Sequence, residues 1–199
     1  MEIIGLCGGS GSGKGEVARI FSASGFLHID ADSVYHRLIS GDSECLRALA
    51  AEFGDGIISP SGALDRSQLA SIVFAPGAED KLRMLNSISH SYILTEIDRE
   101  IALAEGKVPG VLVDAPLLFE SGLNTRCDTV VAVIAPKEVR IPRIIARDGI
   151  TREQAERRIN AQITDETLRE RSDIIIMNNS DLDALKAQVE KIINKILEA

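Results

Sequence analysis

Residues 5–21 read GLCGGSGSGKGEVARIF, and this stretch decides the fold that we expect. Gly8, Gly13 and Lys14 satisfy the GxxxxGK pattern of a phosphate-binding loop that follows an apolar strand and opens an amphipathic helix. Glycines let the backbone wrap so that successive N–H groups face phosphate oxygens, and the helix N-terminus and Lys14 add positive charge. The stretch therefore predicts a nucleotide-binding loop; the alternative is a glycine-rich turn without a ligand.

The last position of this loop departs from the pattern. Where a Ser or Thr hydroxyl would meet magnesium, the sequence has Gly15, followed by Glu16. Magnesium commonly keeps several waters, so nucleotide oxygens and waters held by nearby carboxylates can complete its octahedron. We therefore expect a working loop, in which Glu16 either holds a metal-bound water or is a surface carboxylate that stabilises the helix dipole.

Composition predicts an ordinary globular protein. The chain has 199 residues, of which 45% are hydrophobic and 26% charged, enough for one domain with a full core. It starts directly with a strand-like stretch, and no apolar run approaches the roughly 20 residues of a membrane span, so we expect a cytoplasmic protein without a membrane partner. We also expect a monomer. Cys7, Cys45 and Cys127 lack metal-ligand spacing and are expected to be small core residues.

The charge is unevenly distributed along the chain. A formal net charge of −8 argues against a nucleic-acid partner. Residues 137–172 nevertheless contain nine Lys and Arg against seven Asp and Glu. The positive charge is therefore concentrated in one region of an acidic protein.

Apolar runs predict five buried parallel strands, at residues 3–7, 26–29, 111–113, 129–134 and 174–177. Helical periodicity fills the intervals, and the C-terminal segment predicts an amphipathic helix capped at Ser180 or Asp181. Residues 31–109 have no strong strand; we expect helices after Asp32, at 45–53, from the box-like DRSQ at 65–68, and at 78–105. The alternation predicts an α/β, three-layer fold with a parallel five-stranded sheet.

Acidic residues follow two of these strands, where ligands of doubly wound sheets bind. Asp32 is suited to hold an acceptor hydroxyl and take its proton during phosphoryl transfer; its alternative is a helix N-cap. Asp30 is expected to support the strand and loop geometry. Asp114, on the strand beside the loop, is placed to hold magnesium or its waters, with a structural carboxylate as the alternative.

The chain resembles the dephospho-coenzyme A kinases. The likeness is carried by GLCGGSGSGKG, HIDADSVYHRLI, GDGIISPSGALDRSQLASIVFA, LNSISHSYI, DAPLLFESGL, RIIARDGITREQAERRINAQ and IIIMNNSD, which run through nearly the whole sequence. The resemblance implies ATP-dependent phosphorylation of the ribose 3′-hydroxyl of dephospho-CoA, the last step of coenzyme A synthesis, with ATP and Mg²⁺ as cofactors. It also implies a P-loop kinase fold with a helical acceptor-binding insertion and a mobile lid.

The resemblance assigns roles to individual residues. The expected ATP-binding residues are Gly8, Gly9, Ser10, Gly11, Ser12, Gly13, Lys14, Gly15, Glu16, Arg143, Arg147 and Asn178. The expected acceptor-binding residues are Asp32, His90, Pro116, Leu117 and Leu118, with simple packing as the alternative for the apolar three and a capped core histidine for His90. We expect Lys14, Asp32 and Arg143 to be catalytic, and Asp32 and Asp114 to hold the metal through water.

Two departures from the family pattern stand out. Gly15 and Glu16 replace the usual Ser and Thr, which bears on metal affinity, and Ser91 follows His90 where Pro is usual. We expect a single P-loop kinase domain all the same. Its core comprises residues 1–30, 110–146 and 172–199, its helical acceptor-binding region 31–109, and its lid 147–171.

The expected lid is rich in arginine. It contains Arg147, Arg152, Arg157, Arg158, Arg169 and Arg171, and Thr151 with Gln154 predicts a capping box. A lid that closes over a triphosphate would bring guanidinium groups to the transferring phosphoryl and exclude water. The alternative is a solvated helix whose charge is balanced by Glu153, Glu156 and Glu170.

Other functions also fit the loop. One is a kinase for another small alcohol or a nucleoside, because loop and lid would serve either acceptor. The other is a regulatory nucleotide-binding module without turnover, which would explain Gly15. A signalling GTPase is disfavoured, since the sequence has no guanine-reading NKxD motif.

Overall fold

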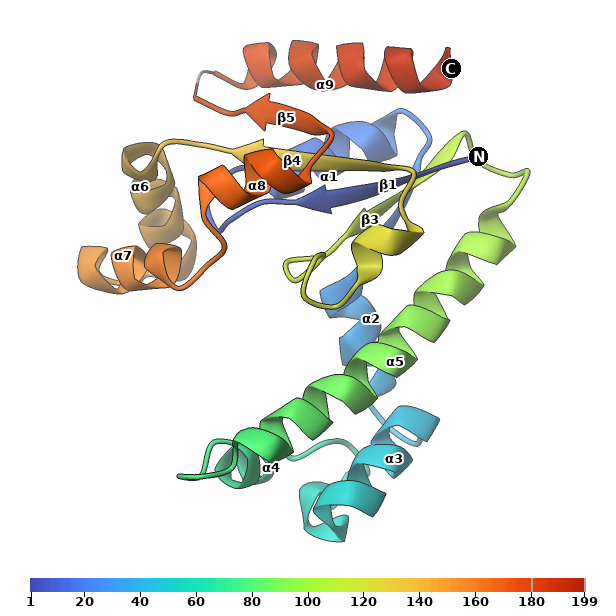
Figure 1. Ribbon diagram of the computed structural model, residues 1–199, viewed down its shortest axis with the longest axis vertical. Helices are drawn as coiled ribbons and strands as arrows, with labels where there is room; N and C mark the ends of the chain where they lie inside the picture. The colour runs from blue at the N-terminus through green and yellow to red at the C-terminus, as the bar shows by residue number, and fades with distance from the viewer. Residues whose placement is uncertain (180, 199) are drawn as a thin grey trace. The chain divides into compact units, whose positions relative to one another are not determined.

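The computed structural model describes residues 1–179 and 181–198, and the chain divides into two compact units. The core unit comprises Met1–Ile29 and Ala104–Ala199, and the helical unit comprises Asp30–Leu103. Each unit has its own buried cluster of apolar side chains. Both units are visible in the ribbon diagram, which is coloured along the chain (Figure 1).

The core unit is built on a five-stranded sheet of order β2-β3-β1-β4-β5. Its strands are β1 (Glu2–Cys7), β2 (Leu27–Asp30), β3 (Gly110–Asp114), β4 (Thr129–Ile134) and β5 (Ile174–Met177). β1 pairs in parallel with β3 and β4, and β4 pairs in parallel with β5. The expected parallel sheet is confirmed, and each predicted strand lies within one residue of the observed bounds.

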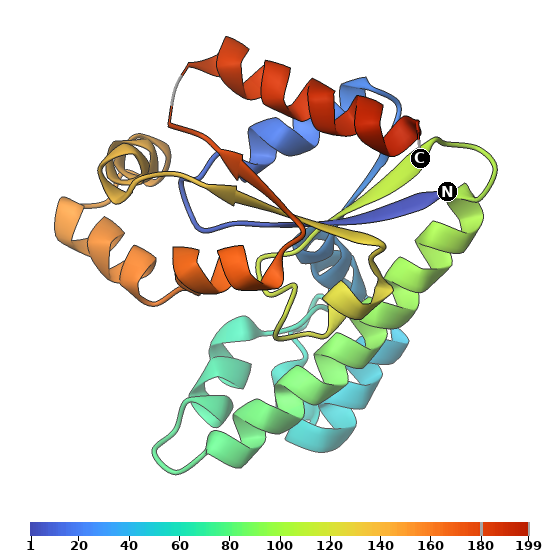
Figure 2. The ribbon, with the colours of Figure 1, turned by 45° about the horizontal axis from the view of Figure 1, so that its top comes forward.

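Helices cover both faces of this sheet. α1 (Lys14–Ala23) and α9 (Leu182–Leu197) pack on one face, where Phe21 and Val189 join strand residues such as Val131 in the main core. On the other face α8 (Asp165–Arg171) contacts β4, and the short 3-10 helix η2 (Leu123–Arg126) contacts β1 (Figure 2). This arrangement confirms the three-layer α/β fold.

Close packing on the second face depends on a glycine in the central strand. A Cβ at Gly5 would lie 2.8 Å from the Cys127 sulfur and 3.0 Å from Leu118 Cδ2. Both side chains come from the segment that connects β3 to β4. The central strand therefore has no side chain where this segment crosses it.

The strand order places the site. β1 lies between β3 and β4, and the chain crosses from one side of β1 to the other between these two strands. Ligands of open parallel sheets bind at such a switch point, beyond the carboxyl ends of the strands. There the register pairs Leu6 with Asp114, which places the carboxylate beside the start of the loop after β1.

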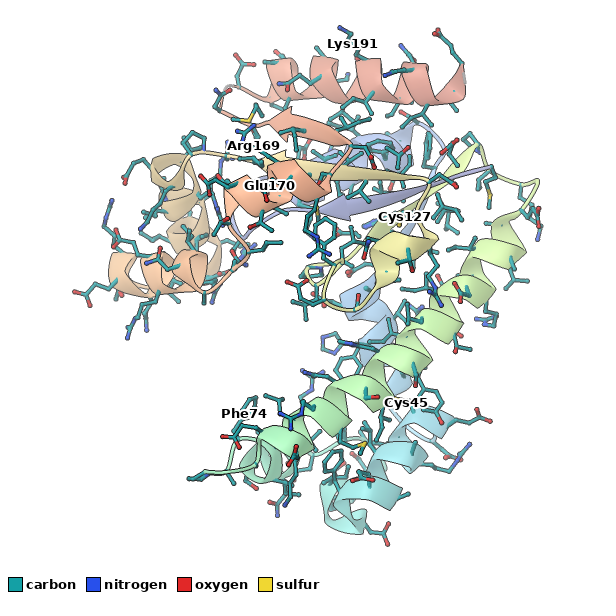
Figure 3. The ribbon with its side chains drawn as sticks, viewed as in Figure 1. Cys45, Phe74, Cys127, Arg169, Glu170 and Lys191 are labelled. Carbon is teal, nitrogen blue, oxygen red and sulfur yellow. The ribbon has the colours of Figure 1, made fainter. Side chains whose placement is uncertain are left out.

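The helical unit matches the expected run of helices. It contains α2 (Ala31–Leu38), α3 (Glu44–Phe53), α4 (Arg66–Val73) and most of α5 (Glu79–Ala104), with the 3-10 helix η1 (Asp55–Ile57) between α3 and α4. Its core includes Cys45, which is buried between the helices (Figure 3). Although α5 has 26 residues, no helix in the described ranges is long and apolar enough to cross a bilayer.

Side-chain caps define the start of several helices. Asp30, not Asp32, is the N-cap of α2: its carboxylate accepts hydrogen bonds from Asp32 N at 3.2 Å and from Ser33 Oγ at 2.6 Å. The cap alternative for Asp32 is therefore wrong, because Asp32 already lies in the first helical turn. The expected role of Asp30 in local geometry is confirmed.

Asp65, at the predicted DRSQ start, caps α4 by accepting a hydrogen bond from Gln68 N at 3.0 Å. The remaining predicted caps lie in the core unit. Thr151 and Gln154 form the expected capping box at the start of α7 (Arg152–Asn160). Asp181 caps α9 by accepting a hydrogen bond from Ala184 N at 2.9 Å. Ser180, the other residue expected to cap this helix, lies outside the described residues.

The cysteines are thiols held inside the protein. Cys7 and Cys45 are buried as expected, while Cys127 is half-buried. Burial raises the pKa of Cys7 to about 11 and that of Cys127 to about 12, so both remain protonated at neutral pH. Within the described part of the chain, no group of three His, Cys, Asp or Glu side chains could hold a metal ion.

The packing of α1 against the sheet can be tested at Phe21. This fully buried ring packs edge-on against Phe26, with centroids 5.2 Å apart. Phe21→Ala should lower the free energy of unfolding by about 3–5 kcal/mol because it leaves a cavity in the core. Phe74→Ala, at a ring that is 70% exposed, should change it by no more than about 0.5 kcal/mol. Denaturant unfolding followed by circular dichroism measures both; equal effects would contradict the assigned core.

Candidate functional site

Residues 8–13 form the loop that joins β1 to α1. Gly11 and Gly13 have φ values of +76° and +98°, in the left-handed region that favours glycine. A Cβ at Gly13 would lie 2.0 Å from Asn178 Nδ2, and one at Gly11 would lie 2.7 Å from the Arg140 carbonyl oxygen. The loop can therefore wrap in this way only with glycine at both positions.

Side chains from two other elements hold three consecutive carbonyl groups of this loop. On α6 (Lys137–Asp148), Arg140 Nε donates to the carbonyl of residue 10 at 2.9 Å and Arg143 Nη1 to that of residue 11 at 3.3 Å. After β5, Asn178 Nδ2 donates to the carbonyl of residue 12 at 2.7 Å. Because N–H and C=O point in opposite directions in a trans peptide, these bonds turn the N–H groups of residues 11 and 13 away from α6 and Asn178.

The start of α1 adds further amides to the same site. N–H groups in the first turn of a helix have no acceptor within the helix, and Gly13 supplies no side-chain cap. Amides at a helix N-terminus, together with the helix dipole, attract phosphate oxygens. The amide of Ser12 donates to the Gly9 carbonyl at 3.1 Å and its side chain is buried, so Ser12 offers no donor to this surface.

Lys14 contacts the carboxylate at the end of β3. Its ammonium group pairs with Asp114 Oδ1, and His28 Nε2 lies 3.6 Å from Asp114 Oδ2. Burial acts to raise the pKa of the Asp114 carboxyl, but hydrogen bonding by His28 and the charge of Lys14 outweigh burial and lower it. The site thus combines a deprotonated carboxylate with a primary ammonium group at the mouth of the loop.

Arginines on one face of α6 line the loop. Positions 140, 143 and 147 fall on the same side of the helix, and all three arginines reach loop residues. Arg147 Nη2 donates to Ser10 Oγ at 3.1 Å and also pairs with Asp148. Sequence analysis singled out Arg143 and Arg147 but missed Arg140, although the spacing of the three could have indicated it.

Arg140 is the most deeply held of these arginines. It is only 4% exposed, and burial lowers the pKa of its guanidinium against an opposing effect of Asp165. Its Nη2 donates to Gln162 Oε1 at 3.0 Å, and the same oxygen accepts from Ser10 N at 2.9 Å. Gln162 was also missed, and its position in the sequence offered no signal.

Four of the five expected lid arginines beyond Arg147 have partners within the protein. Arg152 pairs with Glu138 and Glu156, and Arg158 pairs with Asp148. The guanidinium of Arg171 lies 4.1 Å from the centre of the Phe119 ring, and Arg169 Nη2 contacts Met177 Sδ at 3.2 Å. Arg169 and the neighbouring Glu170 project from α8 (Figure 3).

Gly15 and Glu16 occupy the first turn of α1. Nothing lies within 4 Å of a Cβ built on Gly15, and its φ is not positive. Glu16 pairs with Arg19, with 2.5 Å between Arg19 Nη2 and Glu16 Oε1, and this hydrogen bonding lowers the pKa of the carboxyl. The space around residue 15 would therefore accept a side chain, although the sequence has glycine there.

A hollow of about 220 Å³ lies beside the loop in the core unit. It is lined by Gly13, Glu16, Arg143, Asn178, Asp181, Leu182 and Leu185. Asn178 is 5% exposed, and its amide is fixed by Ser12 O and by Arg143 Nη2 at 3.4 Å from Asn178 Oδ1. The hollow is therefore lined by Gly13 of the loop and by Arg143 and Asn178, which both bond to the loop.

The segment after β3 contains the apolar residues expected to contact an acceptor. Pro116 and Leu117 are exposed, with Leu117 at 53%. Leu118 is fully buried and packs under Gly5. Pro116 and Leu117 therefore present surface, whereas Leu118 belongs to the core.

Asp32 and His90 belong to the helical unit. Asp32 is exposed in the first turn of α2, and its amide N–H is held by the Asp30 carboxylate. His90 is half-buried on α5, and burial lowers the pKa of its imidazole. The neutral form of His90 is therefore favoured at neutral pH.

The two kinds of glycine in the loop can be told apart by substitution. Gly15→Ala should preserve nucleotide binding and raise the free energy of unfolding by up to about 1 kcal/mol, because a helical glycine in open space gains helix propensity. Gly13→Ala should abolish binding, since its Cβ collides with Asn178 and its φ is strained. Isothermal titration with ATP and thermal melts check both; similar behaviour of the two variants would contradict the loop geometry.

The Lys14–Asp114 pair should make stability depend on pH. A lowered pKa means that Asp114 contributes stability above its unfolded value of about 3.9 and loses it as the pH falls through the folded value. Asp114→Asn should therefore reduce the fall in unfolding free energy between about pH 5 and pH 3. Asp42→Asn, at a carboxylate whose side chain is 84% exposed, serves as the control. Parallel pH curves for wild type and Asp114→Asn would argue against this pairing.

Known proteins share this sequence and fold over nearly their whole length. The family model described as Dephospho-CoA kinase matches residues 2–184. The dephospho-CoA kinase of Corynebacterium glutamicum is 40% identical over 195 residues, covering 98% of this chain and 96% of that protein.

Solved structures agree with the sequence matches. TT1252 from Thermus thermophilus superimposes with a TM-score of 0.78 at 31% identity, covering 98% of this chain and 97% of that one. Dephospho-CoA kinase from Campylobacter jejuni gives a TM-score of 0.70 at 27% identity with the same coverage. By its phosphate loop, its fold and these matches, the chain belongs to the dephospho-CoA kinase family.

Proposed function

We propose that this protein transfers the γ-phosphoryl group of ATP to the ribose 3′-hydroxyl of dephospho-CoA, the last step of coenzyme A synthesis. The observation that carries the proposal is the loop at residues 8–13, whose carbonyls are held outward beside Lys14. This geometry suits a triphosphate. The acceptor follows from the family, whose relatives are described as dephospho-CoA kinases.

The core unit binds ATP. The triphosphate lies on the amides of residues 11 and 13 to 15, because those of Ser10, Ser12 and Glu16 already donate to protein oxygens, and Lys14 neutralises the terminal phosphates. Arg143 and Arg147 contribute positive charge from α6. The hollow beside Asn178 receives the adenine, because it opens directly from Gly13 at the loop.

Asp32 serves the acceptor. Its carboxylate accepts a hydrogen bond from the 3′-hydroxyl and takes the proton as the oxygen attacks the γ-phosphorus. The new O–P bond forms as the bond from the γ-phosphorus to the bridging oxygen breaks, and ADP leaves with that electron pair. His90, Pro116 and Leu117 contact the remainder of dephospho-CoA, while Leu118 supports them from the core.

Residues 147–171 act as the lid of a three-part molecule, with the helical region at 31–109 binding the acceptor. Phosphoryl transfer gains from groups that neutralise charge and exclude water, since water would otherwise hydrolyse ATP. Arg147 is an arginine of this lid that contacts the loop, through Ser10 Oγ.

The residues present fit a hydrated magnesium ion. Asp114 offers a deprotonated carboxylate beside Lys14, and magnesium prefers oxygen ligands and retains waters. Within the described residues there is no cluster of three ligands, so nucleotide oxygens and water complete the shell. Asp114 would hold the ion through water, with Asp32 as the second carboxylate. The ion supplies neutralisation of charge on the phosphates.

An ADP-release assay with a panel of acceptors tests the proposal. Dephospho-CoA should support turnover in the presence of ATP and magnesium, whereas nucleosides and other small alcohols should not. Turnover only with another alcohol would identify a different kinase. Nucleotide binding without turnover on any acceptor would identify a regulatory module.

The role of Asp32 has its own test. Asp32→Asn should leave the affinity for ATP nearly unchanged and lower kcat by about 10²–10⁴-fold, because the amide cannot accept the proton. Asp80→Asn, at a carboxylate of the same unit whose side chain is 90% exposed, should leave both quantities unchanged. Equal kcat values for wild type and Asp32→Asn would remove Asp32 from this role.

A further inference from the structure

We propose that Gln162 is a positioning residue of the phosphate loop: its side-chain oxygen fixes Arg140 and the Ser10 amide, and so holds the loop in its binding shape. Gln162 follows α7 and precedes α8, remote in sequence from the loop. The proposal rests on the nucleotide site described above. It concerns ATP binding alone and makes no assumption about the acceptor.

One oxygen atom joins the two groups. Gln162 Oε1 accepts a hydrogen bond from Ser10 N at 2.9 Å and another from Arg140 Nη2 at 3.0 Å. A side-chain amide oxygen has two lone pairs, so both of its acceptor positions are used. Both backbone polar groups of Ser10 are then held, because Arg140 Nε donates to the Ser10 carbonyl at 2.9 Å.

Arg140 acts here as a structural clamp. Its Nε bonds to Ser10, its Nη2 bonds to Gln162, and its Nη1 lies 3.5 Å from Asp165 Oδ1. All three guanidinium nitrogens thus have protein partners, and the residue is 4% exposed. A buried guanidinium that loses one partner is free to reorient, and the loop carbonyl that it holds is released with it.

Gly9 shows how closely this clamp approaches the backbone. A Cβ at Gly9 would lie 2.2 Å from Arg140 Nη2 and 3.1 Å from Gln162 Oε1. The φ of Gly9 is not positive, so its backbone conformation does not require glycine. The clamp accounts for the glycine at this position, because a side chain would occupy the space of the guanidinium.

Loss of Gln162 should therefore weaken ATP binding through the loop. The loop would sample conformations in which residue 10 is no longer held, and apparent affinity falls with the population of the competent form. Gln162→Ala should raise the Kd for ATP and for inorganic tripolyphosphate by about 10- to 150-fold, the range expected for hydrogen bonds to a charged group. The KM for ATP should rise, while kcat should stay within about two-fold of wild type, since the interaction acts on binding.

Isothermal titration of ATP and tripolyphosphate without acceptor measures these affinities. The matched control is Gln154→Ala, which removes the capping box of α7 but none of the contacts to Ser10 or Arg140. Its Kd should stay within about two-fold of wild type. Gln162→Glu keeps an acceptor oxygen, so the Ser10 amide should remain protected from hydrogen exchange in this variant and lose protection in Gln162→Ala.

Several results would overturn the proposal. Gln162→Ala that binds tripolyphosphate as tightly as wild type, or more tightly, would mean that Gln162 is dispensable or competes with phosphate. An equal loss in Gln154→Ala would mean that loosening α7 is sufficient. If Gln162→Ala fails to fold, Gln162→Asn, whose shorter side chain cannot reach both donors, provides the same readout. Wild-type protein that binds no ATP would contradict the proposed function itself. Normal turnover by the wild type, together with unchanged Kd values in the Gln162 variants, would contradict only the role of Gln162.

Discussion

The orientation of three peptide groups governs this site. The carbonyls of residues 10 to 12 are bonded on their outer side by Arg140, Arg143 and Asn178, so the amides of residues 11 and 13 are turned toward the proposed phosphate site. These donors come from α6 and from the end of β5, which are brought beside the loop by the parallel sheet. A loop held in this way needs little rearrangement to accept a triphosphate, and the cost of ordering it is met during folding.

This arrangement also explains why the chain tolerates Gly15. In the proposed site, backbone amides and Lys14 supply the phosphate contacts, so the residue after the lysine is needed only for contact with the metal. Asp114, kept deprotonated by Lys14 and His28, provides an anionic group at the same edge of the sheet. The side-chain hydroxyl that a GxxxxGK[ST] loop places after the lysine is therefore, in the proposed site, one of several ways to hold a hydrated cation.

Sequence pattern predicted the sheet, the loop and most helices, because apolar periodicity, glycine spacing and capping residues are local signals. What it missed depends on tertiary contacts. Arg140 and Gln162 meet at Ser10 only because α6 and the turn after α7 pack beside the loop. The burial of Leu118 follows from its packing under Gly5, which no neighbouring residue signals. The cap of α2 was considered only at Asp32, whereas the backbone geometry makes Asp30 the cap.

The central claim is that the loop is already in its binding shape and holds a triphosphate without a side-chain hydroxyl. Crystal structures of the protein alone and with magnesium and a non-hydrolysable ATP analogue test it most directly. The account predicts that backbone atoms of residues 8–15 agree within about 0.5 Å between the two, with the phosphates on the amides of the loop and Lys14. A loop that refolds around the analogue, or an analogue bound elsewhere, would contradict it.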